Sequence, residues 1–334
     1  RKPVIICGAA LYCVGAALAW AAETLELVLA ARVLQGIGAA APRVVALAII
    51  RDLYEGRRMA QLMSFVMMVF TLVPAMAPAL GHVVIEAFGW RAIFASFILF
   101  SLMSAAWLAF RQPETLLPAN RRPFRSGVLW SGIVEVVTHR QVMLVIIALC
   151  LSFGSLFGVL SSIQPIFDQT FAEGARFHWW FMLIALIAAT GSILNAKIVM
   201  VLGMRRVAGM AYMVQSVLSA AVVLVSLAAP WSEPWAFVLY VGWTASVFFM
   251  VGLTIGNLNA LAMVPMGHIA GMAASIIGSV ATIFGVAIAV PIGLAFEGTP
   301  MPIACGVLTC SAAAYLVVRA LGDPQSSPAS ETGA

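Results

Sequence analysis

Two arginines, Arg32 and Arg43, stand eleven residues apart inside an otherwise apolar stretch of the sequence. In an α-helix eleven residues complete almost three turns, so both side chains would lie on one face, about 16 Å apart. Gln35 and Gly36 follow Arg32 within about one turn of that helix. An arginine at membrane depth must face other protein or a water-filled cavity. The spacing therefore predicts a polar stripe of these four residues that faces a central cavity.

Each arginine also has a plain structural interpretation. Arg32 would then hydrogen-bond the ends of neighbouring helices. Arg43 lies eight residues before Arg51, and its long side chain would extend to the aqueous interface. The sequence leaves these alternatives open.

The helix that carries these residues belongs to an unusually apolar chain. The 334 residues are 63% hydrophobic and only 9% charged, whereas about a quarter of the residues in globular proteins are charged. Apolar runs of about 20 residues are long enough to cross a bilayer. We predict an all-α integral membrane protein, a helical bundle with ten visible transmembrane helices, which cover residues 3–22, 27–50, 61–83, 91–110, 142–166, 179–201, 206–228, 235–263, 269–294 and 300–320.

One long break divides these helices into a group of four and a group of six. It is polar and rich in arginine and proline, as linkers are. The predicted organisation is an N-terminal transmembrane half at 1–110, a linker at 111–141, a C-terminal transmembrane half at 142–320 and a tail at 321–334.

The distribution of basic residues predicts the orientation in the membrane. With alternating spans, thirteen of the 18 Lys and Arg residues fall on the side of Arg1, and only Arg91 and Arg176 fall on the other side. Cytoplasmic loops carry the excess of positive charge, so we expect the linker and the C-terminus in the cytoplasm. Because the net charge of +5 is spread over short clusters between spans, we expect the lipid bilayer as a partner and no nucleic acid.

A second group of residues lies in the third apolar run. Pro74 and Pro78 each remove a backbone donor and would bend a helix. The small residues Ala77 and Gly81 would let a neighbouring helix approach closely. The pattern predicts a kinked, tightly packed seam, and an ordinary proline kink is the alternative.

Other polar residues inside the apolar runs are few. Asn257 and Asn259 would either contact a substrate in the cavity or satisfy one another. The sequence has no phosphate-binding GxxxxGK[ST] motif and no HExxH motif, and its four histidines are scattered. We therefore expect no cofactor, no metal site and no enzyme. The acidic residues fall in turns, termini or helix ends, so no proton carrier can be named.

Several short motifs, in their order and spacing, resemble the major facilitator superfamily. They are RVLQGIGAA at 32–40, VPAMAPALGH at 73–82, GWRAIF at 89–94 and PETL at 113–116. The first resembles the fourth-helix motif, and the second resembles the fifth-helix antiporter motif with Ala77 and His82 in place of two glycines. RDLYEGRRMA at 51–60 and AGMAAS at 270–275 resemble the Bcr/CflA-type multidrug efflux branch.

The resemblance implies a twelve-helix fold made of two six-helix halves. Since RKPV at 1–4 resembles the loop between the second and third helices, it implies that two helices precede Arg1. In that family the proton-coupling acid lies in the first helix.

The function that the resemblance implies is proton-coupled efflux of small amphipathic molecules, such as chloramphenicol-like or bicyclomycin-like compounds, by alternating access. The expected partners are a small-molecule substrate and protons, and we expect a monomer that spans the inner membrane of a bacterial cell several times. The alternatives are an importer of a metabolite and a fragment that does not transport.

Overall fold

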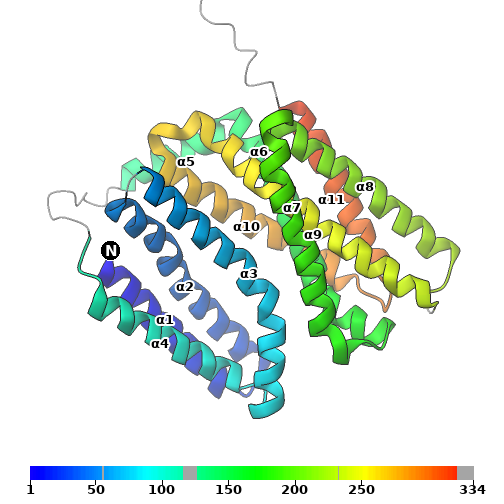
Figure 1. Ribbon diagram of the computed structural model, residues 1–334, viewed down its shortest axis with the longest axis horizontal. Helices are drawn as coiled ribbons and strands as arrows, with labels where there is room; N and C mark the ends of the chain where they lie inside the picture. The colour runs from blue at the N-terminus through cyan, green and yellow to red at the C-terminus, as the bar shows by residue number, and fades with distance from the viewer. Residues whose placement is uncertain (55, 116–125, 232, 322–334) are drawn as a thin grey trace, which may run out of the picture. The chain divides into compact units, whose positions relative to one another are not determined.

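The computed structural model describes residues 1–54, 56–115, 126–231 and 233–321 (Figure 1). The described residues are almost entirely helical, and they contain no strand. The chain divides into two compact units, Arg1–Phe124 and Arg125–Ala334.

The first unit contains four described helices, and local sequence explains where two of them begin. They are α1 (Lys2–Ala21), α2 (Leu25–Leu53), α3 (Gly56–Phe88) and α4 (Ala92–Arg111). A proline in the first turn starts α1, because that position needs no backbone donor. The Thr24 side chain caps α2 by accepting a hydrogen bond of 3.4 Å from the backbone amide of Leu27. Inside α2 and α3 some side chains lie outside the described part of the structure.

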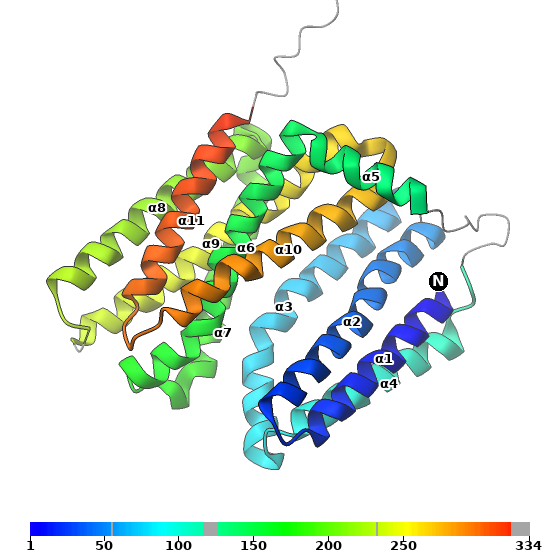
Figure 2. The same ribbon diagram turned by 180° about the vertical axis from the view of Figure 1, so that it is seen from behind.

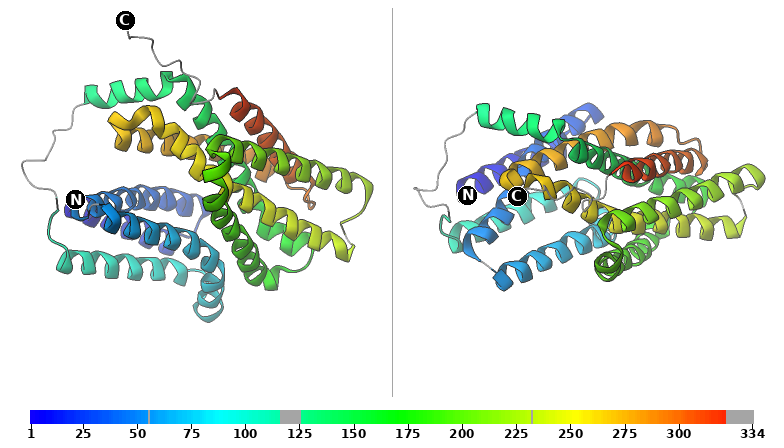
Figure 3. Two further views of the ribbon diagram at one scale, coloured as in Figure 1. Left: turned by 45° about the horizontal axis from the view of Figure 1, so that its top comes forward. Right: turned by 90° about the horizontal axis from the view of Figure 1, so that it is seen from above.

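Helix α1 lies between α2 and α4, and the three run side by side in every view (Figures 1, 2 and 3). None of the twenty residues of α4 is buried within the structure. Leu99, Phe100, Trp107 and Phe110 are each more than two thirds exposed. So much open apolar surface on one helix is unfavourable in water and natural in a lipid bilayer.

The second unit contains the remaining helices, which surround a continuous apolar core. They are α5 (Ser126–Thr138), α6 (Arg140–Pro165), the π-helical η2 (Ile166–Thr170), the 3₁₀ turn η3 (Gly174–Arg176), α7 (Phe177–Leu202), α8 (Met204–Ala228), α9 (Pro234–Met263), the 3₁₀ segment η4 (Val264–Ile269), α10 (Ala270–Leu294) and α11 (Met301–Ala320). Helix α6 packs against α9, α10 and α11, and α9 also packs against α7 and α8.

Small residues bring α6 and α10 close together. A Cβ atom added at Gly154 would lie 2.6 Å from Cγ2 of Ile288, and one added at Gly285 would lie 2.4 Å from Cβ of Phe153. A hydroxyl contact between Ser152 and Tyr212 joins α6 to α8. Small residues and buried hydroxyl pairs are what hold helices together in lipid, where apolar surface alone gives no preference for protein contact.

Within each unit, polar side chains join neighbouring helix ends. The Nε atom of Arg1 lies 3.1 Å from Oδ2 of Asp52, and the Thr115 hydroxyl donates to the same oxygen at 3.0 Å. The start of α1 and the ends of α2 and α4 therefore lie together. In the second unit, Arg205 at the start of α8 donates to the backbone oxygens of Val318 and Arg319 at the end of α11.

Each of the ten predicted apolar ranges coincides with one helix to within one residue where it extends past the helix end. In the described residues, eight helical stretches are long and apolar enough to cross a membrane. One of them, Pro234–Leu294, contains both α9 and α10, and the described part of α3 contributes only the shorter apolar stretch Met76–Phe88. The chain is thus a multi-span helical membrane protein, and the count of ten crossings stays a prediction.

Helix α5 lies within the range 111–141, which the sequence predicts to be a polar linker. Its 13 residues include an apolar face, with Val136 fully buried. Gly132 packs directly on α10, since a Cβ atom added there would lie 2.0 Å from Cε of Met272.

Candidate functional site

Three glycines bring α1 and α2 into backbone contact and thereby position the polar residues of α2. A Cβ atom added at Gly38 would lie 2.4 Å from the backbone nitrogen of Tyr12, and one added at Gly15 would lie 2.6 Å from that of Gln35. At Gly8 the added atom would lie 2.8 Å from Cβ of Ala41. Backbone atoms cannot move aside as a flexible side chain can, so this seam fixes the register of the two helices.

Arg32 and Gln35 form a hydrogen-bonded pair at the edge of this seam. Nη1 of Arg32 donates to Oε1 of Gln35 at 2.6 Å. Gln35 is only 2% exposed, and its Nε2 has no hydrogen-bond partner in the part of the chain that the structure describes. Because a buried amide nitrogen without a partner is costly, this pair has hydrogen-bonding capacity that the described residues leave unused.

The face of α2 beside this pair is open. Arg32 and Gly36 are both exposed within the structure, and a Cβ atom added at Gly36 would meet no atom within 4 Å. Arg32 forms no ion pair with a described carboxylate. A guanidinium carries five N–H donors, so Arg32 can bind a carboxylate or another polar group that approaches this face.

The structure describes only one end of the predicted stripe. The side chain of Arg43 lies outside the described residues, although the backbone of α2 continues past it to Leu53. Whether Arg43 belongs to the same polar stripe as Arg32 therefore stays a prediction.

The predicted proline seam lies in the second half of α3, where the ribbon bends (Figures 1 and 2). A bend there fits the loss of backbone donors at two prolines. The side chain of Pro74 lies outside the described residues, Ala77 is exposed, and Pro78 and Gly81 are half-buried. No atom lies within 4 Å of a Cβ atom added at Gly81, so close packing at this position stays a prediction.

The two predicted asparagines of α9 do not bond to one another. Nδ2 of Asn257 donates to Oδ1 of Asn195 on α7 at 2.7 Å and to the backbone oxygen of Leu253 at 2.8 Å. Asn259 is exposed and donates to the backbone oxygen of Ile255 at 2.9 Å. Asn257 thus joins α9 to α7, and Asn259 presents its side chain at the surface of its unit.

A polar network between α8 and α9 escaped the sequence analysis. The Ser246 hydroxyl donates to Oε1 of Gln215 at 3.1 Å, and Nε2 of Gln215 donates to the Ser219 hydroxyl at 3.2 Å. Nε1 of Trp243 donates to the same hydroxyl at 3.1 Å. The sign of this network in the sequence is a glutamine near the middle of an apolar run. The high hydropathy of the whole run conceals that single polar residue.

These features define the class of protein. The described residues contain no group of three or more His, Cys, Asp or Glu side chains that is able to hold a metal ion. Polar side chains instead sit singly or in pairs inside long apolar helices that form two units. That arrangement is typical of membrane proteins that move solutes, in which polar groups within spans mark the pathway.

Comparison with known proteins gives the family. The family model described as Major Facilitator Superfamily matches residues 1–292. The chain therefore belongs to the major facilitator superfamily, whose members are secondary transporters and not enzymes.

Curated relatives and a solved structure agree with this assignment. The chain is 28% identical over 284 residues to the bicyclomycin resistance protein homolog of Haemophilus influenzae, covering 84% of this chain and 69% of that protein. It is 44% identical over 94 residues to the multidrug resistance protein MdtL of Escherichia coli, covering 28% of this chain and 24% of that relative. The crystal structure of a D-xylose-proton symporter matches with a TM-score of 0.68 at 14% identity, covering 94% of this chain and 80% of that one.

Proposed function

We propose that this protein exports small amphipathic molecules across the bacterial inner membrane in exchange for protons. The observation that carries the proposal is the Arg32–Gln35 pair: Arg32 is exposed on the open face of an apolar helix, and the buried Nε2 of Gln35 has no hydrogen-bond partner among the described residues. The names of the relatives, a bicyclomycin resistance protein homolog and a multidrug resistance protein, supply the substrate class and the direction.

In this proposal the two units are the halves of an alternating-access transporter. The side that holds Arg1, the linker at 111–141 and the C-terminus faces the cytoplasm. Arg32, Gln35, Gly36 and Arg43 line the transport path, while Pro74, Ala77, Pro78 and Gly81 form the seam along α3. Asn257 and Asn259 contact the substrate.

The proposed role of Arg32 is electrostatic. A guanidinium favours the ionised form of a neighbouring carboxyl group and lowers its pKa. When a carboxyl group meets Arg32 in one conformation and leaves it in the other, it releases a proton in the first and takes one up in the second. The protein acts as a monomer in this scheme, with substrate and protons as its small partners.

Transport into everted membrane vesicles tests the proposal. The vesicles are prepared from a bacterium that lacks its own drug efflux pumps and expresses the complete coding region. We expect labelled chloramphenicol or bicyclomycin to accumulate in the vesicles when the lumen is acidic, and a protonophore to abolish the accumulation. Arg32→Lys keeps the charge but not the planar fork of donors, and we expect it to lower the initial rate about tenfold.

A matched control separates this effect from a general loss of arginine. Arg91 lies 4.5 Å from the centroid of the Trp90 ring in the loop before α4, away from the polar pair. We expect Arg91→Lys to transport at the unchanged rate at equal protein level on an immunoblot. Accumulation that does not respond to the pH gradient would overturn proton coupling, and a fully active Arg32→Lys variant would overturn the role of Arg32.

A further inference from the structure

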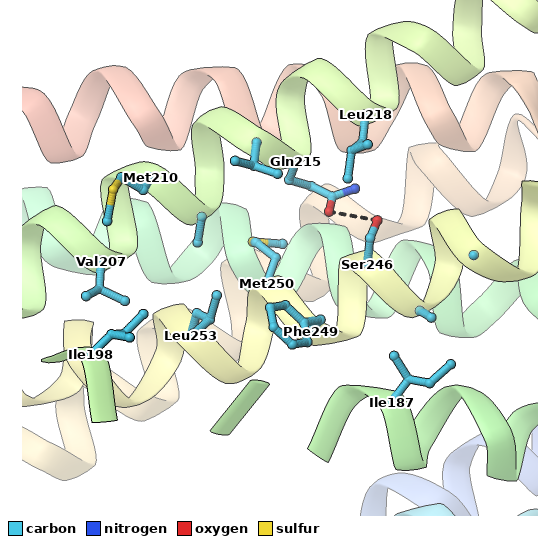
Figure 4. A pocket seen from close by; sticks show the side chains of 14 residues that line it. Ile187, Ile198, Val207, Met210, Gln215, Leu218, Ser246, Phe249, Met250 and Leu253 are labelled. Atoms are coloured by element: carbon cyan, nitrogen blue, oxygen red, sulfur yellow. Dashed lines mark hydrogen bonds between the residues drawn. The ribbon is translucent and has the colours of Figure 1, made fainter. Parts of the chain in front are cut away.

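Unit Arg125–Ala334 contains a cavity of about 530 Å³ that belongs to none of the residues discussed as a transport path. Helix α9 forms its floor, and α7 and α8 form its walls (Figure 4). Pockets of about 300–1,000 Å³ with mostly apolar walls and a few placed polar groups are typical of small-molecule sites. The size alone therefore admits a drug-sized molecule.

The lining is apolar apart from one polar pair. Of its fourteen residues only Gln215 and Ser246 have polar side chains, and none is charged. Figure 4 shows these two side chains facing one another across the cavity wall, joined by the 3.1 Å hydrogen bond. An ionised ligand would lose its hydration here without a counter-charge, so the lining selects an uncharged molecule.

The amide of Gln215 has hydrogen-bonding capacity that its two partners beside the cavity leave unused. A carboxamide offers two N–H donors and two carbonyl lone pairs. Gln215 uses one donor on Ser219 and one lone pair on Ser246. One donor and one acceptor position are left on a side chain that is 1% exposed and lines the cavity. Because the side chain is covered, it must turn slightly toward the cavity before it can form a hydrogen bond to a hydroxyl, carbonyl or amide of a ligand.

The depth of this pair distinguishes between a lipid tail and a small molecule. Gln215 lies near the middle of the 25-residue helix α8, about 16 Å along the helix from its start and about 20 Å from its end. The polar headgroup of a phospholipid stays at the bilayer surface, and its acyl chain has no hydrogen-bonding group. A polar pair at mid-depth thus favours a small amphipathic molecule that enters the hydrocarbon layer whole.

We propose that this cavity between α7, α8 and α9 is a second binding site, which takes an uncharged, mostly apolar small molecule with one hydrogen-bonding group. The molecule lies against Met210, Phe249 and Met250 and bonds to the amide of Gln215. This inference concerns binding within one unit, and it holds whether or not the protein exports drugs.

Gly242 provides the means to close the site. It lines the floor of the cavity on α9, and a Cβ atom added there would meet no atom within 4 Å. A larger side chain at this position would therefore extend into the free space of the cavity. Leu224 on α8 is 66% exposed and does not line the cavity, which makes Leu224→Phe the matched control for added bulk.

The experiment uses the photoreactive alcohol 4-(hydroxymethyl)benzophenone with the full chain in lipid nanodiscs. After irradiation, mass spectrometry locates the label, and we expect it on Met210 and Met250. Excess benzhydrol, which is similar in shape and not photoreactive, should remove most of this label. Gly242→Phe should lower the labelling about tenfold, as expected when the site is filled, whereas Leu224→Phe should leave it unchanged.

A second arm tests the hydrogen bond. We expect Gln215→Leu to lower labelling by the alcohol about fivefold, the effect of losing one hydrogen bond, and to leave labelling by 4-methylbenzophenone unchanged. Labelling that survives both benzhydrol and Gly242→Phe would overturn the proposal. Strong labelling of the same methionines by a benzophenone-bearing phospholipid, without competition by benzhydrol, would also overturn it, because the occupant would then be a lipid tail.

Discussion

Among the described side chains, each unit buries one glutamine in a seam between two membrane helices, and the two glutamines differ in their partners. Gln35 in the α1–α2 seam and Gln215 in the α8–α9 seam are 2% and 1% exposed. The amide nitrogen and the amide oxygen of Gln215 each bond to a neutral serine hydroxyl. Gln35 bonds through its oxygen alone, and the partner is the charged Arg32.

Gln215 thus has a partner at both ends of its amide, whereas the amide nitrogen of Gln35 has none among the described residues. In lipid an unsatisfied polar group costs free energy, because no water replaces its partner. The network of Gln215 meets that demand within its own unit. In the Arg32–Gln35 pair, the amide nitrogen of Gln35 stays unsatisfied among the described residues. Burial therefore does not distinguish the two glutamines, whereas their hydrogen-bond partners do.

The two seams also differ in how closely the helices approach. Glycines in the α1–α2 seam place backbone against backbone, with no room for a side chain at Gly38. In the α8–α9 region the glycine at position 242 faces the empty space of the cavity. The first seam is a rigid support for a charged pair, and the second leaves a volume that a ligand can fill.

The largest effect that we expect comes from filling the tight seam. Gly38→Leu places its Cβ atom against the backbone of Tyr12, which has no low-energy way to move aside. Overpacking costs about 1–3 kcal/mol or more, and backbone contact places this variant at the upper end. We expect little folded protein in the membrane, measured by fluorescence-detected size-exclusion chromatography of a fusion protein.

Gly36→Leu is the matched control for this variant. It lies two residues away on the same helix, where an added Cβ atom meets nothing within 4 Å. We expect it to accumulate as the unchanged protein does. Equal accumulation of the two leucine variants would mean that the α1–α2 contact does not support the fold.

The second effect in size concerns the charged pair. Arg32→Ala would remove the 2.6 Å hydrogen bond that the buried amide oxygen of Gln35 accepts. A buried group left unsatisfied costs about 1–3 kcal/mol, whereas removing both partners is close to neutral. In a detergent titration of unfolding we expect Arg32→Ala to lose stability and the double variant Arg32→Ala/Gln35→Leu to regain most of it. A double variant as unstable as the single one would contradict the pairing.

The helices themselves were predictable from the sequence, and so was the family. Apolar runs of about 20 residues leave few options in a membrane, because only a helix satisfies its backbone there. The resemblance carried by RVLQGIGAA and its companions is confirmed by the family match over residues 1–292. These properties depend on local composition and short motifs.

The partners of the polar residues were not predictable, because they depend on the register between helices. Gly36 is the glycine of the RVLQGIGAA motif that was predicted as a site residue, yet Gly38 in the same motif makes the backbone contact with α1. Asn257 bonds to Asn195, which lies 62 residues earlier in the chain, and not to Asn259. Helix α5 went unnoticed because its prolines and arginines precede it and dominate the composition of the linker.

The third prediction concerns a neutral pair in which one member also bonds to the backbone. Asn195 and Asn257 bond to one another, and Asn257 keeps its bond to the backbone of Leu253 when its partner is lost. Hydrogen bonds between membrane helices are worth about 0.6 kcal/mol on average and up to about 1.7 kcal/mol. In a double-mutant cycle with Asn195→Leu and Asn257→Leu, we expect a coupling free energy of about 1 kcal/mol. A cycle with no coupling would show that the pair does not join α7 to α9.

The smallest effect that we expect on stability comes from Gln215→Leu. When the amide is removed, the Ser246 hydroxyl can direct its single proton to the backbone oxygen of Trp243, which lies 2.6 Å away. The Ser219 hydroxyl still accepts from Nε1 of Trp243 at 3.1 Å. No partner of Gln215 is left without a hydrogen bond, and a leucine of similar size suits the apolar surroundings. The free energy of unfolding should therefore fall by less than about 1 kcal/mol in the same detergent titration.

Gln215→Glu is the informative companion, because it keeps the shape of the side chain and places an acid where no cation lines the cavity. We expect it to destabilise the unit far more than Gln215→Leu at neutral pH, and to recover part of the loss in acid, where the carboxyl group is neutral. A loss of several kcal/mol in Gln215→Leu would show that the network is what holds α8 to α9. The contrast with Gln35 would then rest on packing and not on unused hydrogen-bonding capacity.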